Sequence, residues 1–260
     1  LRQGLVVAGT VPWRDVVDAA AAHDYDFVEL DMEQAFPPEK TDVAAVAEVL
    51  AAHDLDVVVH LPFRLDPASP TEHGREGACR ELEAAIDVAA DLGAETGVMH
   101  ANAERFVHTW GEGALRDALY ESVDRVASYG ADRGVEVCVE NVKDDVFDAG
   151  DFPNLFAATD ASACLDTGHA FVSGFDAAAQ ADLLQEYPDR FSHVHLNDTR
   201  MDGDDEHLPV GLGRVDFETL VAAMAESGWS GTCTHEIYLF GLEYVGTAKT
   251  VFDDLLADAT

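Results

Sequence analysis

The sequence predicts one domain over residues 1–260, folded as a (β/α)8 TIM barrel. Short β-branched runs recur eight times along the chain, and a helical pattern follows each run. Strands that alternate with helical patterns are typical of βα units and a parallel sheet. The length of 260 residues suits eight such units, because this barrel typically takes about 250 residues. An open, doubly wound sheet is the alternative, which is disfavoured because no G-x-G-x-x-G motif follows the first run.

The first half of the chain contains four of the expected strands. Alanine-rich helical segments end in polar turns at residues 21–26 and 51–56, just before the second and third runs. Gly93 precedes the fourth run, and a glycine after a helix supplies the left-handed residue that ends it. We therefore expect strands at Leu5–Ala8, Phe27–Leu30, Val57–His60 and Thr96–His100.

The second half repeats this pattern four more times. Gly134 ends the helical segment before the fifth run, and Gly228 ends the one before the eighth. Asp216 stands at the start of the helix after the seventh strand, where its side chain can cap that helix. The remaining elements are expected at Val135–Glu140, Ala163–Asp166, His193–Leu196 and Thr232–Glu236, with a last helix over Thr247–Ala257.

The chain is strongly acidic. It has 51 acidic and 15 basic residues, which give a formal net charge of −36. The acids fall on the polar faces of expected helices, as Glu81, Glu83 and Asp87 do, so the charge fits a folded domain rather than a disordered chain. This composition resembles that of cytosolic proteins from salt-in halophiles, in which molar salt screens the self-repulsion. It disfavours nucleic acid as a ligand in ordinary salt.

The sequence shows no targeting or membrane signal. It has no run of 18 or more apolar residues, and no basic segment followed by an apolar run opens the chain. The four cysteines show no C-x-x-C spacing, and three of them lie inside expected strands. We interpret them as buried free thiols in a reducing compartment. A cytoplasmic protein without a membrane partner is therefore expected.

Ionisable side chains stand at the ends of six of the eight expected strands. Active sites of TIM barrels lie at the C-terminal ends of the strands, so these side chains would meet at one rim. Such a cluster would be costly if it were left unpaired, and a bound divalent metal ion relieves that cost. The mixed oxygen and imidazole donors suit Mn²⁺, Co²⁺, Mg²⁺ or Zn²⁺. An internal salt network is the alternative, although the expected inner face has almost no cations. The six residues are His60, His100, Glu140, Asp166, His195 and Glu236.

Strand alternation predicts which side chains point into the barrel. In residues 135–140 the valines share one face and would pack on the helices, so Cys138 and Glu140 point inward. By the same reasoning Glu236 points inward and His235 outward. His193 lies two residues before His195 on the same face, and we interpret it as a hydrogen-bonded residue of a deeper layer.

Two loops add further groups to this rim. His169 follows the sixth strand, and the loop after the seventh strand carries Asp205 and His207. That loop turns back through glycines into the next helix. We expect His169 and Arg200 to contact substrate hydroxyls. The aromatic residues that could wall the pocket are Phe63, Trp110, Tyr238 and Phe240.

These motifs together resemble those of the xylose-isomerase-like TIM barrels. That superfamily covers sugar and sugar-phosphate isomerases and epimerases, and also the AP endonuclease family 2 enzymes. The resemblance spans almost the whole chain, although each motif alone is weak. It rests on residues 59–63, 139–141, 165–169, 193–198, 235–236 and the D-x-H-L-P-x-G-x-G loop at 205–213.

The resemblance implies two ligand sets. In the epimerases, two glutamates, an aspartate and a histidine hold one metal ion, and the same glutamates move the substrate proton as acid and base. The matching residues here are Glu140, Asp166, His195 and Glu236. In endonuclease IV three zinc ions are bound. The same four residues would hold the second of these ions. The other two ions would be held by His60, His100 and Glu140, and by His169, Asp205 and His207.

Two features of the sequence favour an isomerase over a nuclease of the endonuclease IV kind. Residues 197–207 are short and acidic, whereas the endonuclease version is longer and has a basic, Ser/Gly-rich portion that faces DNA. Residues 27–31 and 205–209 also look like those of sugar isomerases, with Glu29 as a further candidate for the rim.

We therefore expect a metal-dependent isomerase or epimerase of a small-molecule sugar or sugar phosphate. It would work through an enediolate, with Glu140 and Glu236 as acid and base. The alternatives are an AP-endonuclease-like phosphodiesterase with three zinc ions and a metal-binding barrel without catalysis. A homo-oligomer is left open.

Overall fold

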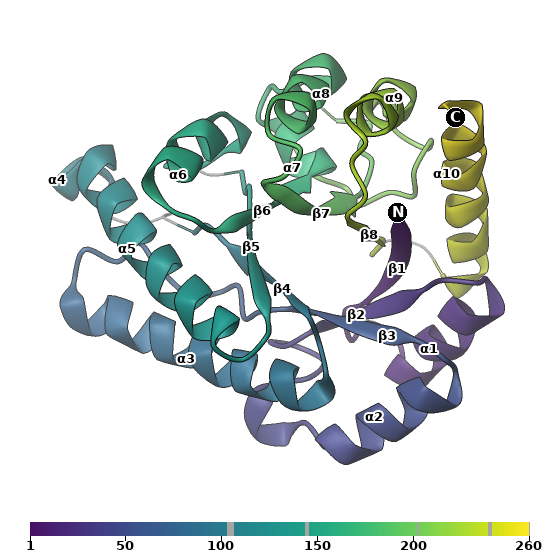
Figure 1. Ribbon diagram of the computed structural model, residues 1–260, viewed down its shortest axis with the longest axis horizontal. Coiled ribbons are helices and arrows are strands. Elements are labelled where there is room, and N and C mark those ends of the chain that lie inside the picture. The colour runs from purple at the N-terminus through teal and green to yellow at the C-terminus, as the bar shows by residue number, and fades with distance from the viewer. Residues whose placement is uncertain (103–106, 144–145, 202, 239–240, 260) are drawn as a thin grey trace.

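The computed structural model describes residues 1–102, 107–143, 146–201, 203–238 and 241–259. Within these residues, eight parallel strands close into a barrel in chain order, and β1 pairs with β8 to complete it (Figure 1). This arrangement confirms the (β/α)8 TIM barrel. The strands are β1 Arg2–Val7, β2 Phe27–Asp31, β3 Asp56–His60, β4 Thr96–His100, β5 Glu136–Glu140, β6 Ser162–Asp166, β7 Phe191–Leu196 and β8 Thr232–His235.

Helices form a ring around the barrel, as Figure 1 shows. No helix of the described residues is both long and apolar enough to cross a lipid bilayer. The longer helices are α1 Trp13–Ala22, α2 Val43–Ala52, α3 Glu72–Leu92, α5 Glu112–Ala131, α6 Phe152–Ala158, α8 Ala177–Glu186, α9 Phe217–Ser227 and α10 Val245–Ala259. The shorter ones are η1 Pro38–Lys40, α4 Val107–Trp110, η2 Ala149–Asp151, α7 Thr167–Val172 and η3 Leu242–Tyr244.

Every strand except β4 differs from its expected range by one to three residues at one end or both. β1 begins at Arg2 instead of Leu5, because residues 2–5 pair with β8. β8 ends at His235, one residue before Glu236. The backbone N–H of Glu236 still donates to the Leu196 carbonyl at 3.1 Å, so Glu236 continues the line of the strand at the rim.

Local turn chemistry ends and begins the helices. Gly93 and Gly228 follow α3 and α9 with φ of +81° and +69°, the left-handed conformation that glycine adopts without strain. The expected cap is confirmed, because the Asp216 side chain accepts the N–H of Thr219 at the start of α9. Asp24 also takes positive φ after α1, as Asp54 does after α2.

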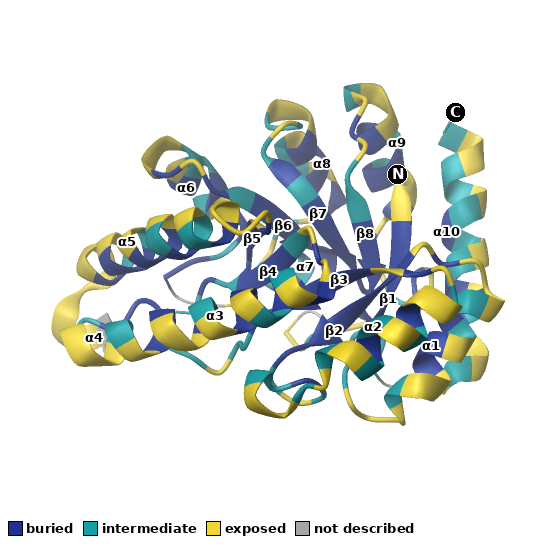
Figure 2. Cartoon of the chain, turned by 60° about the horizontal axis from the view of Figure 1, so that its bottom comes forward, coloured by how far each residue is buried: buried dark blue, intermediate teal, exposed yellow. Residues whose placement is uncertain are grey.

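The interior forms two layers around the strands. Val137 and Val139 belong to the apolar layer shared with the helices, whereas Cys138 packs inside the barrel against Val98 and Cys164. This alternation confirms the predicted inward face of β5 and leaves Glu140 on the same face, at the rim. Figure 2 shows the buried strands at the centre and exposed residues on the outer faces of the helices. All four cysteines are free and buried, as expected.

Candidate metal centre and active site

Four of the expected ligands meet at the C-terminal end of the barrel. Glu140 ends β5, Asp166 ends β6, His195 lies on β7, and Glu236 follows β8. Each residue offers one ligand atom, and these atoms all lie within 4.8 Å of one another. Glu140, Asp166 and His195 are fully buried and Glu236 is nearly so. The closed barrel therefore brings four distant positions of the chain to one point.

The distances around His195 suit donor atoms that share one ion. Its Nδ1 atom lies 3.4 Å from a carboxylate oxygen of Glu140, 3.4 Å from one of Glu236 and 3.8 Å from one of Asp166. Two tetrahedral donors at about 2.1 Å from an ion would lie ~3.4 Å apart. Among the described residues, neither Glu140 oxygen nor His195 Nδ1 has a hydrogen-bond partner. Unpaired buried polar atoms are costly, so this donor set fits a divalent cation.

A second group forms on the other oxygen of Glu140. His60 Nε2 lies 3.3 Å from Glu140 Oε2, and His100 Nε2 lies 3.1 Å from the same oxygen. The His60 Nδ1 atom lies 3.0 Å from the Leu61 carbonyl oxygen, to which it can donate. In that tautomer the Nε2 lone pair faces Glu140 and can bind an ion.

A third group comes from α7 and the loop after β7. His169 Nε2 and His207 Nδ1 lie 3.4 and 3.5 Å from Asp205 Oδ2. His207 has a φ of +47°, which is uncommon for a residue other than glycine. Its N–H donates to Asp205 Oδ1 at 3.2 Å, and the following residue, Leu208, forms a bridge with Asp198. Such a local strain persists only where the surroundings hold it, here at a candidate ligand.

The side chain of Asp198 anchors this loop through hydrogen bonds to its backbone. Its carboxylate accepts the backbone N–H groups of Thr199 at 2.9 Å, Gly213 at 2.7 Å and Val215 at 3.0 Å. A Cβ atom at Gly213 would lie 2.2 Å from Asp198 Oδ1, so only glycine allows this close approach. The loop that carries Asp205 is therefore built around one buried carboxylate.

The pKa values of the buried carboxylates in the site shift in different directions. Burial would raise the pKa of Glu140, but the imidazoles of His100 and His195 outweigh burial and hold that pKa well below its usual range. Burial likewise acts on Glu236, yet His195 and His207 lower its pKa to about 2. Burial dominates at Asp166 and raises its pKa well above the usual value. Two glutamates are thus kept ionised beside a more basic aspartate.

Three imidazoles at this rim become more basic. Burial opposes protonation of His195, but charge from Cys164 and Glu29 holds its pKa well above the usual value. Burial opposes protonation of His60, but the Glu140 carboxylate 3.3 Å from its Nε2 atom raises its pKa to about 9. Burial also opposes protonation of His169, and the neighbouring Asp166 and Glu140 raise its pKa to about 10. In metal-free protein, protons on these rings would supply positive charge beside the carboxylates.

Two supporting residues were not assigned these roles from the sequence. Asn197 donates to Asp166 Oδ2 at 2.7 Å and reaches Glu236 Oε2 at 3.5 Å. Tyr238, expected only as a pocket wall, donates its hydroxyl to Glu236 Oε1 and packs its ring 4.6 Å from that of His207. The sequence signal for Asn197 was its place directly after β7, beside the candidate ligands.

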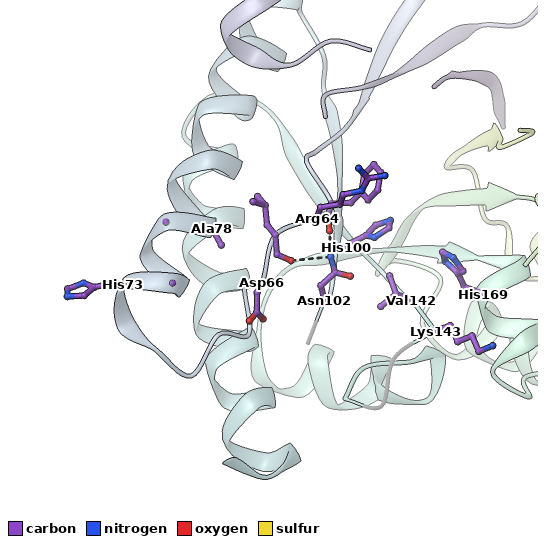
Figure 3. Close-up of a pocket in the computed structure, with 13 residues that line it drawn as sticks. Arg64, Asp66, His73, Ala78, His100, Asn102, Val142, Lys143 and His169 are labelled. Carbon is purple, nitrogen blue, oxygen red and sulfur yellow. Dashed lines mark hydrogen bonds between the residues drawn. The ribbon is translucent and has the colours of Figure 1, made fainter. Parts of the chain in front are cut away.

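A cavity of about 180 Å³ lies over these groups, and its lining includes Phe63, His100, His169, Glu236 and Tyr238. A larger hollow of about 910 Å³ continues from it past His100 and His169 toward the start of α3. Figure 3 shows this hollow, with Asn102 donating to backbone carbonyls of the segment after β3. The arrangement can hold a small molecule against the buried carboxylates.

Four expectations from the sequence lie elsewhere. The Arg200 guanidinium pairs with Glu206 and its side chain is 66% exposed, so the structure does not bring it into the cluster. Trp110 is half exposed and lines neither cavity. Phe240 lies outside the described residues. Glu29 was expected at the rim, which is wrong: β2 continues to Asp31, so Glu29 lies one layer deeper, fully buried.

Comparison with known proteins identifies relatives of two kinds. A probable endonuclease 4 of Mycobacterium leprae (strain Br4923) is 27% identical over 242 residues, which cover 88% of this chain and 92% of the relative. The crystal structure of a D-tagatose 3-epimerase-like protein covers 100% of this chain and 98% of its own at a TM-score of 0.87 and 22% identity. The crystal structure of an IOLI protein with a bound zinc atom covers 100% of this chain and 99% of its own, at a TM-score of 0.84 and 15% identity. Likeness to solved structures at these identities shows the fold alone.

A family model extends this likeness over most of the sequence. It is described as the xylose isomerase-like TIM barrel, and it matches residues 17–250. Its range includes all nine candidate ligands of the three groups described above. The chain belongs to the xylose isomerase-like TIM barrel family.

Proposed function

We propose that the protein is a metal-dependent isomerase or epimerase of a sugar or sugar phosphate. One observation carries this proposal: the buried carboxylates of Glu140 and Glu236 each place an oxygen within 4.8 Å of the other. They come from β5 and from the end of β8, strands that are not neighbours in the barrel. A substrate carbon between them would be reached from two sides, as proton removal and return on opposite faces require.

The two glutamates would divide the proton transfer. One removes the proton beside the substrate carbonyl and the other returns it, a contribution of typically ~10²–10⁴-fold in rate. Hydrogen bonds from Tyr238 and Asn197 orient Glu236, whereas among the described residues the Glu140 oxygens have no hydrogen-bond partner. A divalent ion held by Glu140, Asp166, His195 and Glu236 would supply Lewis-acid polarisation of the carbonyl.

The cavity supports a small substrate. Apolar ring faces of Phe63 and Tyr238 wall it, and polar groups come from Asp31 at the end of β2 and from Gln34 in the turn after it. A few polar groups in a concave, partly apolar site are typical of small-molecule recognition. His60 and His100 would then contact substrate hydroxyls rather than an ion.

Deuterium incorporation tests this proposal. The metal-loaded protein would be incubated in D₂O and molar KCl with a panel of ketoses and ketose phosphates. We expect exchange at the carbon beside the carbonyl of one substrate, and loss of that exchange in Glu140→Gln and Glu236→Gln. Glu81→Gln on the exposed face of α3 is the matched control. No exchange on any sugar by a protein that holds its metal would contradict the proposal.

A phosphodiesterase of the endonuclease IV kind is the second candidate. It is favoured by the three ligand groups, since His60, His100 and Glu140 form one and His169, Asp205 and His207 another. The charge of −36 and the pairing of Arg200 with Glu206 oppose binding of a nucleic acid backbone. Cleavage of a duplex with one abasic site, assayed at the same salt, distinguishes this candidate.

A further inference from the structure

We propose that Glu29 is a positioning residue that fixes the ring orientation and tautomer of His195. Glu29 lies on β2 and His195 on β7, and both side chains are almost completely buried. The inference rests on the metal site proposed above and not on the reaction assigned to it.

The contact between these two residues sets the roles of the two ring nitrogens. His195 Nε2 lies 3.1 Å from Glu29 Oε1, while Nδ1 faces Glu140 and Glu236 at 3.4 Å. An ionised carboxylate only accepts hydrogen bonds, so Nε2 carries the proton that Glu29 accepts. When a metal ion takes the place of the proton on Nδ1, the ring presents its Nδ1 lone pair to the point where the carboxylates converge.

Glu29 is itself held in place by a chain of hydrogen-bonding groups. Its Oε2 atom accepts the Thr234 hydroxyl and lies 3.2 Å from His193 Nε2. The other nitrogen of His193 lies 2.6 Å from the Thr232 hydroxyl. Both glutamate oxygens are therefore occupied, so the carboxylate is anchored on the side away from His195.

The carboxylate of Glu29 is buried inside the barrel, where a charge is costly, so we infer that it has a function there. The neighbouring inner layer is apolar, with Val98, Cys138 and Cys164 fully buried. An apolar side chain at position 29 would avoid the desolvation of a carboxylate. A carboxylate that accepts the second N–H of a ligand histidine raises the basicity of that ligand and fixes its orientation, and losing it typically costs 10–100-fold in metal affinity.

Metal affinity tests this role apart from activity. The dissociation constant for Zn²⁺ would be measured by chelator competition in molar KCl for the wild type, Glu29→Gln and Thr234→Val. We expect Glu29→Gln to bind Zn²⁺ roughly 10–100-fold more weakly. Thr234→Val removes one bond that anchors Glu29 but leaves the contact with His195, so it should weaken Zn²⁺ binding less than Glu29→Gln does. Glu81→Gln, on the exposed face of α3, is the matched control, and its affinity should stay close to that of the wild type.

Nitrogen NMR of histidine-labelled wild-type protein gives a second test that needs no variant to fold. We expect the zinc-loaded protein to show His195 protonated at Nε2 and unprotonated at Nδ1. The opposite tautomer, or equal zinc affinity in the wild type and Glu29→Gln, would overturn the inference while leaving the proposed function standing. A wild type that retains no ion would overturn both.

Discussion

Glu140 and Glu236 both approach the same imidazole nitrogen: a carboxylate oxygen of each lies 3.4 Å from His195 Nδ1. One side chain ends β5 and the other follows β8, and both are almost completely buried. Carboxylates this close repel each other unless a positive charge lies between them. The folded protein therefore depends on a cation or on extra protons at this point.

Metal removal is the first prediction. Chelation should lower the melting temperature and abolish activity, because an ion that binds only the folded state stabilises it by mass action, by about 2.7 kcal/mol at 100 times its dissociation constant. Melting curves would be recorded before chelation, after verified metal removal, and after the ion is restored. An unchanged curve and full activity in the metal-free protein would rule the site out.

The second prediction concerns pH in the metal-free protein. His60 and His169 have folded-state pKa values raised to about 9 and about 10. Their unfolded values are about 6.5. Their contribution to stability is therefore fully present below pH 6.5, and it is lost as pH rises through the folded values. The free energy of unfolding should fall over this range.

Denaturant titrations from pH 6.5 to 10 would measure this fall. The metal-loaded protein serves as the control, because a bound ion replaces the protons and affinity should rise as the rings deprotonate. His60→Gln should make the metal-free curve flatter. A metal-free stability that does not change with pH would show that these imidazoles are not coupled to the carboxylates.

The fold could be predicted because each βα unit carries its own signals. Gly93 and Gly228 end their helices as expected, and the valines of β5 face outward. The bounds of β1 and the end of β8 could not be predicted, because they depend on the pairing that closes the barrel between Arg2–Leu5 and β8. Local sequence patterns therefore predict which strands and helices form, whereas the pairing of β1 with β8 determines where these two strands begin and end.

The candidate ligands could be predicted from their place at strand ends, which meet at one rim in a closed barrel. The contacts that orient them could not. Glu29 reaches His195 across the barrel interior, and the Tyr238 hydroxyl donates to Glu236 two residues earlier in the chain. Arg200 was expected at the substrate, but a nearby Glu206 pairs with it. Side-chain partners are set by the tertiary structure.

A third prediction concerns salt. A net charge of −36 should make stability rise with KCl, because at 1 M the Debye length is about 3 Å and surface charges are screened. Circular dichroism melts across a KCl series would measure the unfolding midpoint, with a neutral osmolyte series as the control. A midpoint independent of salt would contradict the interpretation of the acidic surface.

A fourth prediction tests the packing at Gly168. A Cβ atom there would lie 1.7 Å from Asn197 Oδ1 and 2.7 Å from Asp205 Oδ1. Gly168→Ala should therefore displace Asn197 from Asp166, weaken metal binding, and lower stability by typically ~1–3 kcal/mol. Gly113→Ala in α5 is the control, since nothing lies within 4 Å of its added Cβ. Equal urea midpoints and metal affinities for the two variants would contradict this packing.

The number of ions bound per chain, compared between the wild type and His100→Ala, tests the proposed function most directly. His100 lies outside the group of Glu140, Asp166, His195 and Glu236. Our account predicts one tightly bound ion in both proteins, with Glu140→Gln as the control that loses it. Three ions in the wild type that fall to two in His100→Ala, with cleavage of abasic DNA lost in step, would contradict an isomerase and establish the phosphodiesterase.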